Sequence, residues 1–181
     1  MKFSRLQIPD LIHIEPQVHL DDRGYFTETF RQDKLENFLG RPLTFLQDNE
    51  SESSQGVFRG LHYQLPPCAQ TKLVRVVSGT ILDIAVDIRK NSPTFGQHIQ
   101  TELSAKRQNQ LFVPQGFAHG FVVLSPTAKI CYKVDNYYHP EADRSLNVSD
   151  PALDLNLPVE DWIRSVKDIN APMLHQADLF E

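Results

Sequence analysis

The chain has 181 residues, 40% of them hydrophobic, and a formal net charge of −5, which favours a single folded domain over residues 1–181. The negative charge argues against nucleic acid as a partner, because such partners need an overall basic surface. The apolar runs are too short to span a membrane, no signal-peptide core follows the N-terminus, and Cys68 and Cys131 lack metal-ligand spacing. These features predict a reduced, cytoplasmic protein.

Short strands and one helix are predicted in the first quarter of the chain. Apolar and polar residues alternate over residues 3–9, a short apolar run covers residues 11–14, and a turn at 21–24 leads into a strand that reaches Phe30. Residues 32–39 have helical spacing and are followed by Gly40 and Pro42, which predicts one short helix. Residues 45–49 resume as a strand, and residues 51–55 predict a serine-rich loop.

The stretch 56–72 concentrates chemically useful side chains in a stiffened backbone. Glycines 56 and 60 bracket a short strand, and prolines 66 and 67 constrain the loop after it. Arg59, His62 and Lys72 therefore lie at positions that the backbone holds in place. The alternative for any one of them alone is a surface cation or a sheet histidine that only packs.

The clearest hairpin pattern follows, with strands at 73–77 and 81–89 on either side of Gly79. In the second strand one row of side chains is apolar and predicts a core face. The opposite row, which contains Asp83 and Asp87, is either solvated or points into a polar cavity.

Further strands at 111–124 and 128–134 predict a mainly β fold, and the segment from Pro151 onward predicts loops with a short helix. Many short strands joined by glycine and proline turns indicate a jelly-roll sandwich or barrel whose mouth could hold a ligand. Pro114-x-Gly116-x-x-His119 matches the second half of the cupin pattern, and the residues around His62 are similar to its first half. The second histidine and the carboxylate of a metal-binding cupin are absent, so we expect no metal and no cofactor.

Eight sequence strings, in order along the chain, resemble the dTDP-4-dehydrorhamnose 3,5-epimerase family. The strings are Asp22-Arg23-Gly24-x-Phe26-x-Glu28, Gln47-Asp48-Asn49, residues 56–64, Ala69-Gln70-x-Lys72-Leu73-Val74-Arg75-Val76, Asp83-x-Ala85-Val86-Asp87-Ile88-Arg89, residues 92–96, Pro114-x-Gly116-Phe117-Ala118-His119-Gly120-Phe121 and Tyr132-Lys133. The resemblance implies a cupin-like jelly roll that forms a homodimer by exchanging its N-terminal strands. It also implies an isomerase that converts dTDP-4-dehydro-6-deoxy-D-glucose to dTDP-4-dehydro-L-rhamnose, for L-rhamnose and polysaccharide biosynthesis, by inverting C3 and C5.

The implied catalytic residues suit this chemistry, because both carbons flank a ketone and inversion needs a base, an enolate stabiliser and an acid. His62 suits the base, Lys72 the developing oxyanion and Tyr132 the acid, and the resemblance adds Asp168 as the partner of the His62 imidazole. Without the resemblance, Tyr132 would be interpreted as a sheet tyrosine that packs on its neighbours.

The resemblance also implies a set of substrate-binding residues. They are Arg23, Arg59 and Lys167 for the diphosphate or sugar, Glu28, Gln47 and Asn49 for the nucleotide, Phe26 and Tyr138 as flat faces, His119 beside the sugar, and Asp143. Asp143 departs from the family, which often has glutamate there, so its binding role is open. Tryptophans of the family are replaced by residues such as His98, Val148 and Leu157.

Two alternatives remain at this level. One is a monoepimerase that acts at C3 or C5 alone, on this or a related 4-keto-6-deoxy nucleotide sugar. The other is a sugar-binding cupin without catalytic activity, against which the presence of His62, Lys72 and Tyr132 argues.

Overall fold

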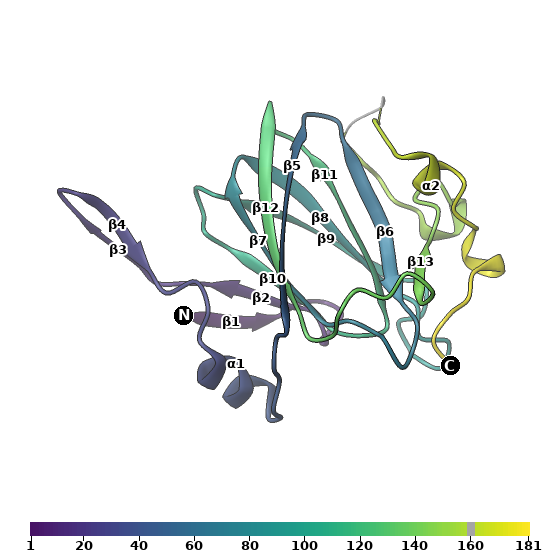
Figure 1. Ribbon diagram of the computed structural model, residues 1–181, viewed down its shortest axis with the longest axis horizontal. Helices are drawn as coiled ribbons and strands as arrows, with labels where there is room; N and C mark the ends of the chain where they lie inside the picture. The colour runs from purple at the N-terminus through teal and green to yellow at the C-terminus, as the bar shows by residue number, and fades with distance from the viewer. Residues whose placement is uncertain (159–161) are drawn as a thin grey trace.

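Two antiparallel sheets packed face to face make up the body of the protein (Figure 1). The computed structural model describes residues 1–158 and 162–181. The larger sheet has the order β1 (Lys2–Arg5), β2 (Ile12–Glu15), β10 (Gln110–Val113), β7 (Lys72–Ser78), β12 (Thr127–Val134) and β5 (Gln47–Ser54). The smaller sheet has the order β13 (Asp143–Ser145), β6 (Phe58–Gln64), β11 (Phe117–Val123), β8 (Thr80–Asp87) and β9 (His98–Ser104).

The sheets remain open at their edges, so the mainly β, cupin-like fold is a sandwich and not a closed barrel. Its central core joins apolar residues of both sheets, among them Val74, Ile130 and Phe121. No helix in the described ranges is long and apolar enough to cross a membrane.

The predicted hairpin around Gly79 is wrong, because β7 and β8 belong to different sheets. β7 pairs with β10 and β12, whereas β8 pairs with β11 and β9. Gly79 has a φ of 83°, and a Cβ there would lie 2.2 Å from the carbonyl oxygen of Thr127. A glycine is therefore required where the chain crosses tightly from one sheet to the other.

The two rows of β8 are both buried, and each faces a different layer. Ile84 and Val86 belong to one apolar cluster with Leu153 and Leu174 of the C-terminal segment. The opposite row faces the space between the sheets, where Asp83 is completely buried. The apolar row is therefore a core face, as predicted, and the Asp83 carboxylate lies in a polar interior.

From Pro151 onward, the described residues form loops, as predicted, with three short helices where one was predicted. These are η1 (Pro151–Leu153), α2 (Val166–Ile169) and η2 (Leu174–Gln176). They lie against the smaller sheet, and α2 contacts β6 (Figure 1).

The predicted helix is α1 (Gln32–Leu39), and it ends at Gly40 in a left-handed conformation. The serine-rich loop predicted at 51–55 is wrong, because β5 continues to Ser54 in unbroken register with β12. Before α1, β3 (Val18–Asp21) and β4 (Gly24–Thr27) form a separate hairpin that projects from the sandwich (Figure 1). We call residues 18–27 the arm.

Candidate active site in the sandwich interior

His62 lies in the middle of a row of polar side chains that crosses the smaller sheet. Its register partner on β13 is Ser145, and its partner on β11 is His119. Because directly opposed residues of antiparallel strands share a face, the three side chains lie next to one another. The row faces the larger sheet, from which Lys72 reaches across to the backbone of His62.

The His62 imidazole is held by a buried carboxylate. Its Nε2 lies 2.6 Å from Oδ1 of Asp168, and the side chain of Asp168 is buried. Burial by itself would raise the pKa of Asp168, but hydrogen bonds from His62, Ser165 and the Gly60 amide outweigh it and lower that pKa. Asp168 is therefore ionised and accepts the hydrogen bond from Nε2, so that in the neutral imidazole Nδ1 is the acceptor.

Lys72 is a buried cation on β7. Its Nζ donates to the backbone carbonyl of His62 at 3.1 Å, and 9% of the residue is exposed. Burial lowers the pKa of Lys72 to about 8, an effect that Asp83 and Asp143 oppose and Lys167 reinforces. The ammonium therefore loses its proton at a pH far below that of an ordinary lysine.

Tyr132 is a half-buried phenol on β12, where it pairs with Asn49 of β5. Burial raises the pKa of Tyr132, while Arg59 lowers it and Asp143 raises it further. The phenol therefore keeps its proton at neutral pH. Arg59 itself donates from Nε to Oγ of Ser53 at 2.9 Å.

A second histidine and carboxylate pair lies deeper in the interior. Nε2 of His119 is 2.9 Å from Oδ1 and 3.0 Å from Oδ2 of Asp83. Sequence reasoning assigned no role to Asp83 beyond the acidic row of its strand. The available signal was a carboxylate inside an otherwise apolar strand, at a position that alternation places opposite Ile84.

The remaining predicted binding residues near this interior form one hydrogen-bonded chain. Gln47 donates from Nε2 to Oδ1 of Asn49 at 2.7 Å and accepts from the backbone amide of Tyr138 at 3.1 Å. The Tyr138 hydroxyl donates to Oδ2 of Asp143 at 3.1 Å, and Nζ of Lys167 lies 2.5 Å from the same oxygen.

Three predicted residues are not brought to this interior. Arg23 and Phe26 lie on the exposed arm, where Arg23 pairs with Asp21. Glu28 follows the arm and pairs with Arg31 and Lys34. In Figure 1 the arm projects away from β6 and β13.

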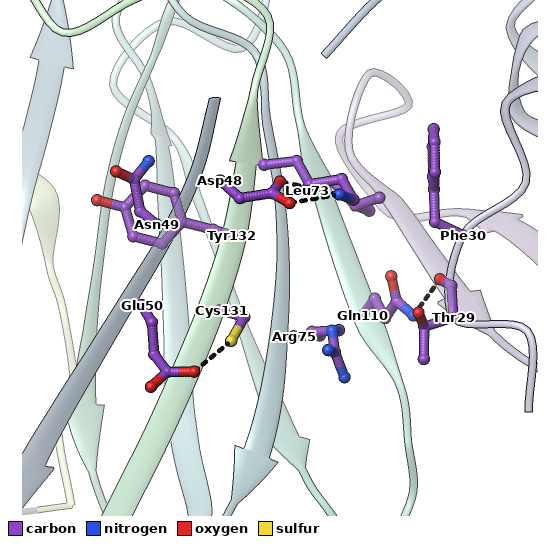
Figure 2. A pocket seen from close by; sticks show the side chains of 11 residues that line it. Thr29, Phe30, Asp48, Asn49, Glu50, Leu73, Arg75, Gln110, Cys131 and Tyr132 are labelled. Carbon is purple, nitrogen blue, oxygen red and sulfur yellow. Dashed lines mark hydrogen bonds and ion pairs between the residues drawn. The ribbon is translucent and has the colours of Figure 1, made fainter. Parts of the chain in front are cut away.

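A cavity of about 280 Å³ lies on the larger sheet, and Thr29 and Phe30 are among the residues that line it. Figure 2 shows Arg75, Gln110 and Cys131 around it, with the Cys131 thiol bonded to Glu50. Asn49 and Tyr132 lie at the side away from Gln110 and Thr29 (Figure 2). This cavity contains neither His62 nor Lys72.

A metal, as found in many cupins, does not fit the residues present. His62 and His119 each use Nε2 to bind a different aspartate. Within the described ranges, no group of three or more histidine, cysteine, aspartate or glutamate side chains is arranged to hold a metal ion.

The fold and this interior define a cupin-like sandwich with titratable side chains enclosed between its sheets. The sequence model of dTDP-4-dehydrorhamnose 3,5-epimerase matches residues 5–176. The chain belongs to the dTDP-4-dehydrorhamnose 3,5-epimerase family.

The individual relatives agree along nearly the whole chain. It is 48% identical to the dTDP-4-dehydrorhamnose 3,5-epimerase of Shigella flexneri over 180 residues, 99% of each chain. A solved epimerase of Legionella pneumophila in complex with dTDP-4-keto-L-rhamnose is 44% identical, with a TM-score of 0.94 over 98% of this chain and 94% of that one. A 3′-monoepimerase of Streptomyces bikiniensis in complex with dTDP-quinovose is 33% identical, with a TM-score of 0.90 over 94% of this chain and 86% of that one.

Proposed function

We propose that this protein is an isomerase that inverts C3 and C5 of dTDP-4-dehydro-6-deoxy-D-glucose to give dTDP-4-dehydro-L-rhamnose. The observation that carries the proposal is the contact of one histidine with two ionisable groups. The His62 ring is bonded to Asp168, and the His62 carbonyl is bonded to Lys72. These two contacts support a base at His62 and an oxyanion stabiliser at Lys72 in one interior, and the chain belongs to a family of such epimerases.

In the proposed reaction, His62 Nδ1 removes a proton from a carbon next to the C4 ketone. The electron pair of the broken C–H bond moves into the ring, and negative charge develops on the C4 oxygen, where the Lys72 ammonium stabilises it. The Tyr132 hydroxyl then donates a proton to the opposite face of that carbon, which inverts it. His62 returns its extra proton to solvent and Tyr132 regains one before the second carbon reacts.

The proposed binding residues follow the geometry of the interior. Gln47 and Asn49 hold the nucleotide, Tyr138 offers its ring, and His119 lies beside the sugar. Arg59 and Lys167 contact the diphosphate or sugar, and Asp143, whose binding role the sequence left open, lies next to Lys167. Support comes from the hydrogen-bonded chain that links Gln47 to Lys167 through Tyr138 and Asp143.

We also propose a homodimer in which each arm completes the partner's site. On the arm, Leu20 is 81% exposed, Tyr25 60% and Phe26 67%. Large apolar side chains exposed together mark a surface that another chain covers. Arg23, Phe26 and Glu28 would then reach the partner's substrate. A monomer in analytical ultracentrifugation at micromolar concentration that kept full activity would contradict this arrangement.

The two unpaired cysteines support a location in the reducing cytoplasm. That location also suits a nucleotide-sugar substrate.

Proton exchange in D₂O tests the reaction directly. Incubation of dTDP-4-dehydro-6-deoxy-D-glucose with the protein, followed by NMR, should show deuterium at both C3 and C5 and formation of the L-rhamno product. Exchange at one carbon would indicate a monoepimerase, the activity named for the structurally similar Streptomyces bikiniensis protein. No exchange at either carbon would leave a sugar-binding protein without this activity.

A further inference from the structure

Lys167 and Asp143 form an ion pair at the edge of the smaller sheet. Nζ of Lys167 lies 2.5 Å from Oδ2 of Asp143, and the Tyr138 hydroxyl donates to the same oxygen at 3.1 Å. The three residues come from α2, from the loop before β13 and from β13 itself. Three segments of the chain therefore meet at a single carboxylate oxygen.

The two members of the pair differ in their freedom to move. The Lys167 side chain is 48% exposed, whereas the Asp143 side chain is 16% exposed. Asp143 lies on a strand that pairs with Gln64, and its carboxylate also accepts from Tyr138. Lys167 makes no other ion pair among the described residues. A long, half-exposed lysine with one partner can swing to another anion, while the carboxylate stays in place.

The charges around Asp143 explain why the pair matters for a ligand. Besides contacting Lys167 and Tyr138, the Asp143 carboxylate interacts electrostatically with two groups of the opposite sheet. It raises the pKa of Lys72 on β7 and of Tyr132 on β12. Arg59 lowers the pKa of Tyr132, and Asp83 raises the pKa of Lys72. An anionic ligand that enters here meets a carboxylate that repels it and a lysine already occupied by that carboxylate.

We infer that Asp143 is an internal competitor that occupies Lys167 until the diphosphate of a nucleotide displaces it. This inference rests on the proposed function, because it takes the diphosphate of a dTDP-sugar as the displacing anion. A diphosphate carries more negative charge than one carboxylate and offers more acceptor oxygens to the ammonium. Asp143 is a positioning residue in this scheme. It holds the Lys167 ammonium and the Tyr138 hydroxyl in place before the nucleotide binds, and it weakens nucleotide binding because it must be displaced.

A binding experiment with a double-mutant cycle tests the competition without any turnover. The probes are dTDP, dTMP and thymidine, measured by calorimetry on the full-length wild type, Asp143→Asn, Lys167→Gln and the double variant. Asp143→Asn should bind dTDP about two- to fivefold more tightly, the size of a half-exposed ion pair. Lys167→Gln should bind dTDP more weakly, and thymidine affinity should not change in either variant.

A matched control separates competition from a general loss of negative charge. Asp178 is also an acid at this edge, and it pairs with Arg144 at 2.9 Å. Asp178→Asn should leave dTDP affinity within twofold of wild type. Thermal unfolding of each variant verifies the fold, and Asp143→Ala replaces Asp143→Asn if the latter does not fold.

Three results with the variants would overturn the inference directly. They are weaker dTDP binding by Asp143→Asn, the same gain when Lys167 is already glutamine, and an equal gain in Asp178→Asn. If the wild type bound dTDP and exchanged both substrate protons, but dTDP affinity were the same in all four proteins, only the competition would be refuted. Wild type that bound no dTDP would refute the proposed function with it.

Discussion

The Lys72 ammonium and the His62 carbonyl oxygen, 3.1 Å apart, join the two sheets across the interior. β7 and β6 belong to different sheets, so this bond crosses the sandwich and fixes a cation next to the backbone of the imidazole residue. The same carbonyl orients the ammonium, whose charged form is disfavoured by burial although Asp83 and Asp143 favour it. Lys72 therefore lies where it can stabilise charge next to His62, but burial of its own charge destabilises the fold. Its substitution can separate these two effects.

Lys72→Met should lower activity and raise stability together. Loss of an oxyanion stabiliser of this kind costs about 10²–10³-fold in kcat. Burial lowers the pKa of Lys72 from 10.5 to about 8, so the charged form opposes folding at neutral pH. After allowance for the lost hydrogen bond to His62, the free energy of unfolding at neutral pH should rise by about 1–3 kcal/mol. Urea unfolding measures this change.

The sign of that effect can be tested by its pH dependence. A lysine whose pKa is depressed in the folded state destabilises it most below about pH 8, and the penalty disappears as pH rises toward 10.5. The stability advantage of Lys72→Met should therefore shrink over that interval. An advantage that stayed constant with pH would mean that packing, and not charge, produces it.

The alkaline limb of the pH–rate profile should report Lys72. Because its pKa is about 8, kcat/KM should fall as pH rises through that value, about tenfold per unit once the amine is neutral. Asp83 supports the charged form, so Asp83→Asn should move the limb to lower pH. Steady-state kinetics over a range of pH measures both. A limb that stayed flat to pH 10 would remove Lys72 charge from the mechanism.

Asp168→Asn should impair His62 without removing it. The carboxylate fixes the Nε2 proton and the ring orientation, whereas an amide can donate to Nε2 and favour the wrong tautomer. We expect kcat to fall by about 10²–10⁴-fold, with a smaller change in KM. Ser165→Ala is the matched control, because it removes the helix cap at the Asp168 amide and one hydrogen bond to the carboxylate but leaves the contact of Asp168 with His62 in place. Near-normal turnover by Asp168→Asn would show that the contact is structural.

Ser145→Ala should stabilise the protein. The Ser145 hydroxyl is buried and is the single buried side-chain oxygen or nitrogen in the described ranges without a hydrogen-bond partner. An unsatisfied buried hydroxyl costs about 1–3 kcal/mol, and alanine removes it without a large cavity. The melting temperature should rise. Ser145→Thr, which retains the hydroxyl, should give no gain, and a lower melting temperature for Ser145→Ala would indicate a hidden partner.

The sequence predicted elements well where local rules decide them. The helix at 32–39 follows from its spacing and from Gly40, which takes the left-handed conformation at its end. The hairpin at Gly79 failed because alternation and a turn residue are equally compatible with a crossing between sheets. Which sheet each strand joins depends on partners such as Lys129, which lies 51 residues after Ser78 in the chain.

The prediction of a serine-rich loop at 51–55 failed for a reason linked to function. Both faces of β5 are polar, because one is exposed and the other faces the site, where Ser53 accepts from Arg59. No apolar alternation marks such a strand. The stiffened stretch 56–72 pointed to Arg59, His62 and Lys72, but family resemblance was needed to place His62 beside Asp168, because 106 residues separate them. Nothing local predicts the contact of His119 with Asp83.

Tyr132→Phe tests the division of labour most sharply. If His62 removes the proton and Tyr132 returns one from the opposite face, the enolate still forms without the phenol but is reprotonated by His62 on the original side. Deuterium should then enter the substrate with retention at one carbon at least, while inversion falls by about 10²–10⁴-fold. His62→Ala should abolish exchange at both carbons, whereas a His62 that only bound substrate would raise KM and spare kcat.

NMR in D₂O separates these outcomes, since exchange and inversion are read from the same spectra. A tyrosine that only packs in β12 would lower stability without uncoupling exchange from inversion. The phenol is half-buried and its pKa is raised by burial, so it is protonated over the pH range of the assay. If Tyr132→Phe inverted both centres at close to the wild-type rate, another side chain or a water would be the acid, and Tyr132 would have only a packing role.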